Sequence, residues 1–136
     1  MKLILLRHAK SGWDDPTLDD HDRPLDDRGR VAATALGAWL RARGHRPARI
    51  LSSTAARTRE TVARLDLSDA DTTFRHDLYL ATASHILALA RGDTPLLIVA
   101  HNPGMARAAA TAVAAPPAHA AFVQYPTGAG TIVDRS

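Results

Sequence analysis

Three short apolar runs, separated by stretches with helical periodicity, constrain the fold of this chain more than any other feature. The runs are Leu3–Leu6, Arg49–Leu51 with its flanks, and Leu96–Ala100. Uninterrupted apolar runs of this length are typical of strands that are buried on both faces of a parallel sheet. Because strands that alternate with helices form such a sheet, we predict an α/β fold, a three-layer α/β/α sandwich with a largely parallel central sheet.

Helices are predicted in the segments that follow the first two runs. The first helix has one apolar face, formed by Ala32, Ala35, Leu36, Trp39 and Leu40. Asp26 or Asp27 would cap its start, and Gly44 would close it. The second helix lies in STAARTRETVARL, with Ser53 or Thr54 as its N-cap.

The second half of the chain continues this alternation. The segment TFRHDLY predicts a short strand, and a helix is predicted from Thr82 to Arg91 with Gly92 as its cap. A further helix is predicted from about Pro103 to Ala114, because proline suits the first turn of a helix. At the end of the chain, AFVQY and GTIVD could pair around PTGAG as a closing hairpin.

Length and composition limit the class of protein. A chain of 136 residues is expected to form one domain, here residues 1–136. Cysteine is absent, which excludes disulfides, thiolate metal ligands and cysteine nucleophiles. No stretch approaches the roughly 18 to 20 apolar residues that span a membrane, and the first residues do not resemble a signal peptide. We therefore expect a cytoplasmic protein without a membrane partner, and we favour a monomer.

The net charge of +3 raises the question of nucleic-acid binding. The basic residues are nearly all arginines spread along the chain, with no block rich in lysine and arginine and no interleaved aromatic residues. We therefore expect no nucleic-acid partner. A small anionic substrate explains the positive charge more simply.

Polar residues follow each of the three predicted strands. They are Arg7 and His8 after the first strand, Ser52, Ser53 and Arg57 after the second, and His101 and Asn102 after the third. Ligands of open α/β sheets bind at the carboxyl ends of the strands. If all three strands are parallel, two histidines and two arginines meet at the same edge of the sheet.

Two imidazoles and two guanidinium groups in one site favour phosphoryl chemistry. A guanidinium is permanently cationic, and its planar fork matches phosphate oxygens. A metal site would instead require carboxylates near the histidines and fewer fixed positive charges. One neutral imidazole can attack phosphorus in line, and the second, held protonated by its surroundings, can donate to an equatorial oxygen. The product would be a phosphohistidine enzyme, which water then hydrolyses.

The motifs LLRHAKS, DRPLDDRGR, SSTAARTRETV, LYLA, VAHNPG and YPTGA occur in the order found in the histidine phosphatase superfamily. Over essentially its whole length the chain resembles this superfamily, and within it the small SixA-type phosphohistidine phosphatases. The resemblance implies a phosphoglycerate mutase-like fold, with no metal and no organic cofactor. It also implies hydrolysis of phosphohistidine on a partner protein, such as a phosphotransfer domain or a phosphocarrier, through a covalent phosphohistidine intermediate.

The resemblance assigns roles to individual residues. His8 is the phosphorylated nucleophile, and Arg7, Arg57 and His101 complete the catalytic set around the phosphoryl group. Three further residues are candidates for substrate binding: Arg23, Ser11 and Asn102. Arg23, in DRPL, would reach the phosphate from a loop. Alternatively, it could pair with one of its neighbouring aspartates, Asp20, Asp22 or Asp26.

One part of the superfamily pattern is missing. Larger members carry a glutamate that protonates the leaving oxygen, whereas the only glutamate here is Glu60, on the predicted second helix. Asp77 is a candidate general acid, but it could equally be a turn residue. An imidazole is a far better leaving group than an alkoxide. The missing glutamate therefore favours phosphoramidate substrates over alcohol phosphomonoesters.

Two other functions stay open at this point. A broad phosphomonoesterase would act with the same residues on a small phosphorylated substrate. A non-catalytic module that binds phosphate or a phosphoprotein would need the arginines but no nucleophile. The presence of both His8 and His101 argues against this second alternative.

Overall fold

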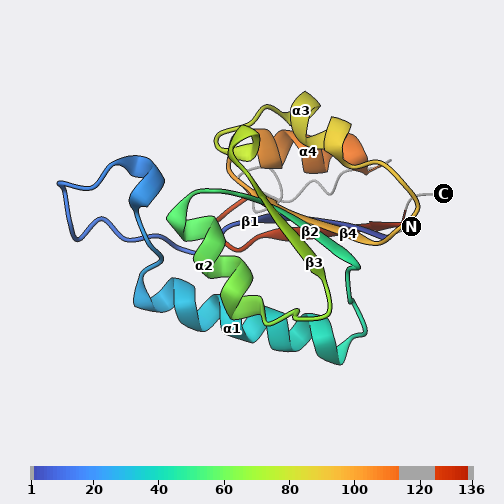
Figure 1. Ribbon diagram of the computed structural model, residues 1–136, viewed down its shortest axis with the longest axis horizontal. Coiled ribbons are helices and arrows are strands. Elements are labelled where there is room, and N and C mark those ends of the chain that lie inside the picture. The colour runs from blue at the N-terminus through green and yellow to red at the C-terminus, as the bar shows by residue number, and fades with distance from the viewer. Residues whose placement is uncertain (1, 114–124, 135–136) are drawn as a thin grey trace.

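The computed structural model describes residues 2–113 and 125–134, which form a five-stranded sheet with helices on both faces (Figure 1). The strands are β1 Lys2–Arg7, β2 Arg49–Ser53, β3 Asp71–Arg75, β4 Leu96–Ala100 and β5 Gly130–Asp134. Their order is β3-β2-β4-β1-β5. The first four strands are parallel, and β5 runs antiparallel to β1. The predicted α/β/α sandwich with a largely parallel sheet is confirmed.

Helices and two short 3₁₀ turns connect the strands. They are η1 Asp20–Asp22, α1 Asp27–Ala42, α2 Ala56–Leu65, η2 His76–Leu78, α3 Ala83–Leu89 and α4 Gly104–Ala112. Figure 1 shows α1 and α2 on one face of the sheet and α3 and α4 on the other. In residues 2–113 and 125–134, no helix is long and apolar enough to cross a bilayer.

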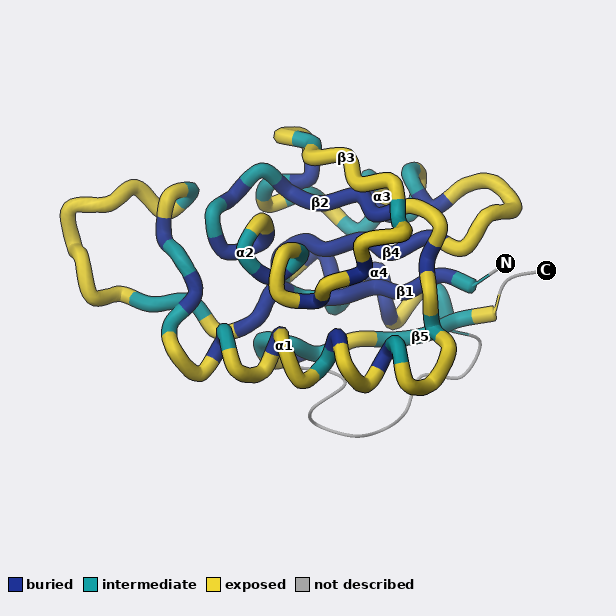
Figure 2. The backbone as a smooth tube through the Cα atoms, turned by 60° about the horizontal axis from the view of Figure 1, so that its bottom comes forward, coloured by how far each residue is buried: buried dark blue, intermediate teal, exposed yellow. Residues whose placement is uncertain are grey.

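Alternation along β1 divides the core into two layers. Leu3 and Leu5 pack in the layer that contains residues of α3 and α4, whereas Ile4 and Leu6 pack in the layer that contains residues of α1 and α2. Between β1 and β2, strand β4 is buried along its whole length (Figure 2). Burying one aliphatic side chain contributes about 1.5–3 kcal/mol. The central strands are therefore firmly held, and so are the residues that directly follow them.

The first helix is capped as the sequence predicts. Asp26 is the N-cap of α1, and its side chain accepts a hydrogen bond from the Gly29 amide at 2.7 Å. Beyond the end of α1, Gly44 has a φ of +74°, which favours glycine. The backbones of α1 and α2 approach closely at Gly37, where a Cβ atom would lie 2.1 Å from the carbonyl oxygen of Leu65.

Two predicted helix boundaries are wrong. Ala55, and neither Ser53 nor Thr54, is the N-cap of α2. Ser53 is still part of β2, and its hydroxyl accepts a hydrogen bond from the Ala55 amide at 3.2 Å. The helix predicted to extend to Arg91 ends at Leu89, because the next residue leaves the helical conformation.

The edges of the sheet also differ from the prediction. The short strand predicted in TFRHDLY begins earlier, at Asp71, and ends at Arg75, after which His76–Leu78 forms a 3₁₀ turn. In the predicted closing hairpin, residues 121–124 lie outside the described residues, as does Ala114 at the predicted end of the fourth helix. The segment GTIVD forms β5 and pairs with β1, with Ile132 opposite Ile4.

The loop between β1 and α1 projects from the body of the fold (Figure 2). Most residues from 13 to 20 are exposed, and the Trp13 side chain is 73% exposed. The two ends of the loop meet at an isolated bridge between Ser11 and Leu25. The Asp-rich stretch of the sequence therefore forms an exposed loop whose two ends lie side by side.

Candidate active site

A pocket of about 340 Å³ lies at the carboxyl ends of β1 and β4 and beside the start of α2. It is lined by Arg7, His8, Lys10, Ser11, Trp13, Arg23, Arg57, Leu80, His101, Asn102 and Thr127. The parallel strands bring together the residues that the sequence places at their ends. All four predicted catalytic residues and all three predicted substrate-binding residues line this pocket, whereas Asp77 does not.

His8 directly follows β1 and is only 4% exposed. Its Nδ1 atom lies 2.6 Å from the carbonyl oxygen of Ala9, and the Nε of Arg57 lies 3.3 Å from its Nε2 atom. A carbonyl oxygen can only accept and the Arg57 Nε–H can only donate. Nδ1 therefore carries the proton, and Nε2 presents its lone pair toward the arginine side of the pocket.

Burial lowers the pKa of His8 to about 4, and the positive charges of the neighbouring arginines add to this effect. The hydrogen bond to the Ala9 carbonyl opposes the shift without cancelling it. At neutral pH the imidazole of His8 is uncharged. A neutral imidazole with an unprotonated Nε2 is the form that can act as a nucleophile.

His101 directly follows β4, and its ring centroid lies 5.3 Å from that of His8. Its Nε2 atom is 2.8 Å from the Ser53 hydroxyl oxygen at the end of β2. Burial, followed by the charge of Arg57, lowers the pKa of His101 to about 3. The surroundings of His101 therefore do not hold it protonated as expected, because burial and a cationic neighbour both favour the neutral ring.

Arg7 and Arg57 bring two guanidinium groups to the pocket. The Nη1 of Arg7 donates to the Tyr125 carbonyl oxygen at 3.1 Å, and burial and the charge of Arg57 lower the pKa of Arg7. The buried atoms Arg7 Nε and His101 Nδ1 have no hydrogen-bond partner among residues 2–113 and 125–134. Buried polar atoms without a hydrogen-bond partner are costly. An anion with several oxygens can satisfy such groups.

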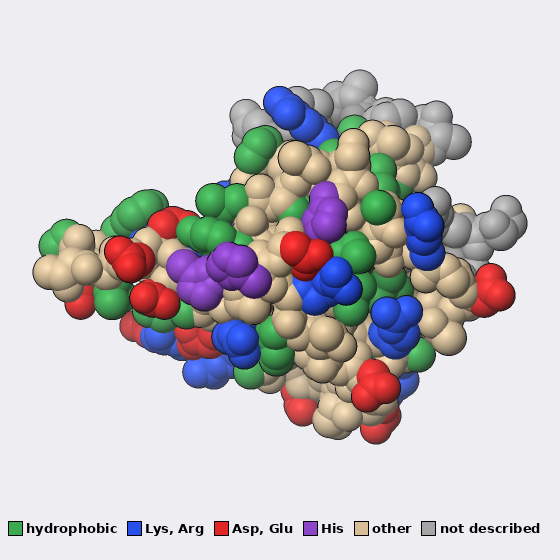
Figure 3. Space-filling view, turned by 45° about the horizontal axis from the view of Figure 1, so that its top comes forward, with side chains coloured by type: hydrophobic (Ala, Val, Ile, Leu, Met, Phe, Trp, Pro, Cys, Tyr) green, Lys and Arg blue, Asp and Glu red, His purple; other side chains and the backbone are tan. Residues whose placement is uncertain are grey.

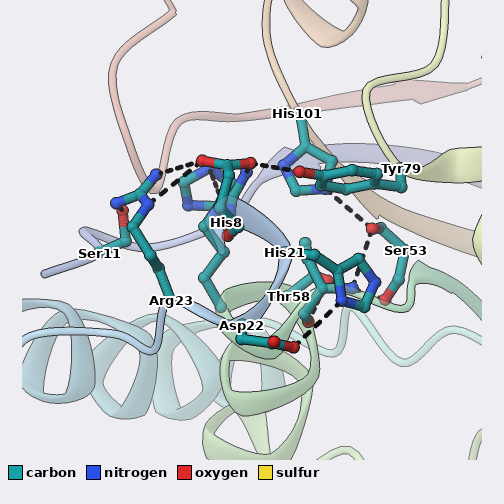
Figure 4. Close-up of polar contacts among 12 residues, drawn as sticks. His8, Ser11, His21, Asp22, Arg23, Ser53, Thr58, Tyr79 and His101 are labelled. Atoms are coloured by element: carbon teal, nitrogen blue, oxygen red, sulfur yellow. Dashed lines mark hydrogen bonds and ion pairs between the residues drawn. The ribbon is translucent and has the colours of Figure 1, made fainter. Parts of the chain in front are cut away.

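Arg23 reaches the pocket from the projecting loop, and its side chain is 8% exposed. Its Nη1 atom donates to the Ser11 hydroxyl at 2.9 Å, and the two side chains lie together in Figure 4. The Trp13 ring covers the guanidinium, with the Arg23 Cζ atom 3.4 Å from the ring centroid. Arg23 also pairs with Asp20, so the two roles that the sequence leaves open for Arg23 are compatible in space.

Asn102, a candidate for substrate binding, and Asp77, the candidate general acid, differ in their surroundings. Asn102 lines the pocket, but its Nδ2 donates to the Tyr125 carbonyl and its Oδ1 accepts from the Ala106 amide. These contacts tie the loop after β4 to Tyr125 and to the first turn of α4. Asp77 is bonded to Arg75 and to His85, and this pairing lowers its pKa. An exposed, ion-paired Asp77 outside the pocket does not suit a general acid.

Tyr79 and Thr61 are missed by the sequence analysis, which names Asp20 only as one of three possible partners of Arg23. Asp20 contacts both Arg23 and Arg57, and Tyr79 donates its hydroxyl proton to the Asp20 carboxylate. Thr61 accepts a hydrogen bond from the Ala9 amide at 3.1 Å and donates to the Arg57 carbonyl at 2.7 Å. The position of Thr61 four residues after Arg57 on a predicted helix is the signal that could have identified it.

The charge distribution does not indicate a metal or a nucleic acid. Within the described part of the chain, no group of three or more histidine, aspartate or glutamate residues could hold a metal ion. On the face shown in Figure 3, the described acidic and basic side chains are interspersed and do not form one basic stripe. The buried arginines and histidines are concentrated at the pocket instead.

Comparison with known proteins gives one consistent family. The family model of the histidine phosphatase superfamily, branch 1, matches residues 3–79. An uncharacterized chloroplastic protein of Arabidopsis thaliana is 39% identical over 124 residues, which cover 79% of this chain and 57% of that protein. The chain spans only 57% to 65% of the length of the curated relatives that it matches.

Two solved structures are similar over nearly the whole chain. One, from Agrobacterium tumefaciens, is provisionally described as the phosphohistidine phosphatase SixA; it has a TM-score of 0.90 and 31% identity, covering 98% of this chain and 91% of that one. A second, from Nakamurella multipartitia, carries the same provisional description. It has a TM-score of 0.78 and 34% identity, and covers 96% of this chain and 82% of the other.

Proposed function

The chain belongs to the histidine phosphatase superfamily, and we propose that it is a phosphohistidine phosphatase that acts through a covalent phosphohistidine on His8. One observation carries this proposal more than any other. A buried, neutral His8 keeps its Nε2 lone pair inside a pocket lined by three arginines. A module that only binds phosphate would need the arginines but would gain nothing from a nucleophile.

In the first step, Nε2 of His8 attacks phosphorus and a bond between these atoms forms. The P–N bond of the substrate breaks, and its electron pair leaves with the substrate imidazole, which takes a proton from solvent. In the second step, water attacks the phosphorus of the phosphorylated His8. The bond to Nε2 breaks, its electron pair returns to the ring, and the proton of the water is lost to solvent as phosphate is released.

The cationic side chains stabilise the charge on the transferring phosphoryl group. Arg57 presents a buried guanidinium group and Arg7 a half-buried one, and Arg23 reaches the same pocket from the loop. His101 is neutral in the empty pocket, but an arriving phosphoryl dianion raises the pKa of a nearby imidazole. We therefore propose that His101 gains a proton when the substrate binds and then shares the charge of the phosphoryl oxygens.

The absence of a protonated carboxylic acid supports a P–N substrate. Among the described residues that line the pocket there is no carboxylate. Asp20, which pairs with two of the lining arginines, is kept ionised because its hydrogen bonds to Tyr79, Arg23 and Arg57 lower its pKa. Glu60 is paired with Arg30. An alkoxide leaving group needs such an acid, whereas a substrate imidazole does not. The substrate that we propose is phosphohistidine on a phosphotransfer domain or a phosphocarrier. The cytoplasmic location of the protein stays a prediction.

Chemical trapping tests this proposal. The chain is mixed rapidly with a labelled phosphoramidate, denatured at alkaline pH, and mapped by peptide mass, because phosphohistidine is labile in acid. We expect one phosphoryl group on the peptide that holds His8 and none in His8→Asn. The control His45→Asn, which alters a histidine outside the pocket, should label like the wild type. Turnover without labelling at any quench time would refute the covalent route, and neither turnover nor labelling would favour a binding module.

A substrate panel separates the enzyme alternatives. We expect kcat/KM for phosphohistidine to exceed that for alkyl phosphates such as sugar phosphates by at least about a hundredfold, since the acid that an alkoxide requires is missing. Comparable values for both substrates would instead favour a broad phosphomonoesterase.

A further inference from the structure

Asp20 binds the guanidinium groups of Arg23 and Arg57, the two pocket arginines that do not belong to β1. Its Oδ1 accepts from Arg23 Nε and Nη2 at 3.2 and 3.0 Å, and its Oδ2 accepts from Arg57 Nη2 at 3.0 Å. The backbone carbonyl of Asp20 accepts from Arg57 Nη1 at 2.6 Å. The Tyr79 hydroxyl also donates to Oδ2. One residue at the start of η1 therefore joins two arginines that lie far apart in sequence.

A carboxylate and a phosphoryl group engage a guanidinium in the same way, through two oxygens that face the planar fork. The N–H groups of Arg23 and Arg57 that bind Asp20 are thus groups that a phosphoryl oxygen would use. The side chains of Arg57 and Arg23 are only 4% and 8% exposed, whereas that of Asp20 is 42% exposed. The carboxylate can therefore move into solvent more easily than either arginine can turn away.

We propose that Asp20 is an internal counter-anion that holds Arg57 and Arg23 in the empty pocket and that an incoming phosphoryl group must displace from them. The inference rests on the proposed function, in which these arginines bind the phosphoryl group. Asp20 acts through the arginines and is a positioning residue rather than a catalytic one. The displaced carboxylate gives up the Tyr79 hydroxyl together with the two arginines and gains water in their place.

This competition has a consequence for turnover. Three guanidinium groups without an anion repel one another, and the Arg57 charge already lowers the pKa of Arg7. Asp20 relieves part of this repulsion when the pocket is empty. After hydrolysis the same carboxylate returns to the arginines and so weakens the binding of the product phosphate. The pocket can therefore use strong cationic groups without retaining its product.

Calorimetric titration with inorganic phosphate at low ionic strength tests the proposal without any turnover. We expect Asp20→Asn to bind phosphate about tenfold more tightly than the wild type, because a competing charge-assisted pair is removed. The matched control is Asp22→Asn, which removes the same charge from the same 3₁₀ turn but is bonded to His21, and it should leave the dissociation constant within about twofold.

The direction of the change separates competition from simple structural support. If Asp20 only kept the arginines in place, its loss would weaken phosphate binding, so an unchanged or weaker affinity in a folded Asp20→Asn variant overturns the proposal. Tyr79→Phe gives a second test, because it removes a donor to the carboxylate and should also tighten phosphate binding, by about threefold. If the wild type itself binds no phosphate, the proposed function fails as well.

Discussion

Mild acid should destabilise this chain through its two pocket histidines. The pKa values of His8 and His101, about 4 and about 3 in the folded chain, lie below the ordinary value of 6.5 that applies after unfolding. Between these values the unfolded chain binds more protons than the folded chain. The contribution of these two neutral histidines to the free energy of unfolding is therefore complete above about pH 7, and it is lost as the pH falls through 6.5 and below.

The size of this loss of stability follows from the pKa shifts of the two histidines. At pH 5, each histidine is almost fully protonated in the unfolded chain and almost fully neutral in the folded chain, which lowers the free energy of unfolding by about 2 kcal/mol per residue. The two together give about 4 kcal/mol, a large part of the roughly 5–15 kcal/mol that stabilises a typical domain. Asp20 and Asp77 do not contribute in this range, because their lowered pKa values matter only below about pH 4.

Urea denaturation at pH 7.5 and at pH 5.0 measures this difference directly. We expect His8→Gln and His101→Gln each to remove about half of the pH-dependent loss and the double variant to remove nearly all of it. For each variant, the free energy of unfolding at pH 5.0 is subtracted from that at pH 7.5. A loss of stability that is equal at both pH values therefore does not affect the result. A double variant that loses as much stability at pH 5.0 as the wild type would refute the assignment of the buried neutral histidines.

Three further changes test the packing and the geometry of the site. Thr61→Val leaves the buried Ala9 amide without an acceptor, and we expect a loss of about 1–3 kcal/mol in urea denaturation together with a lower kcat/KM. Gly37→Ala places a methyl group against the Leu65 carbonyl, and thermal denaturation should show a destabilisation of about 1–3 kcal/mol. Arg57→Lys keeps the positive charge but loses the planar fork, so kcat/KM should fall about a hundredfold while the melting temperature changes little.

The sequence predicts those parts of the fold and the site that depend on regular elements. Buried apolar runs identify β1, β2 and β4, and their parallel arrangement brings His8 and His101 to one edge of the sheet. Arg57 is predicted for the same reason, because α2 begins directly beyond β2. For these residues the sequence position alone determines the place in the fold.

Other features depend on contacts that a sequence does not reveal. Asp20 belongs to a run of similar aspartates in an irregular loop, and only the folded chain distinguishes the one that meets Arg23 and Arg57. The charge state of His101 depends on its burial, which a motif does not encode. Likewise, β5 pairs with β1, which lies at the other end of the sequence, whereas the local turn signals predict a hairpin with residues 121–125.

The order of the strands also makes the site depend on a strand from late in the sequence. β1 and β2, which lead to His8 and to Arg57, do not pair with each other, because β4 lies between them in the sheet. A nascent chain that has emerged only as far as residue 79 holds the nucleophile and three arginines but lacks the strand that fixes their separation. Under the proposed function, binding of a phosphoryl group therefore requires β4, residues 96–100, which lies between β1 and β2, and we expect a fragment that ends before residue 96 to lack activity.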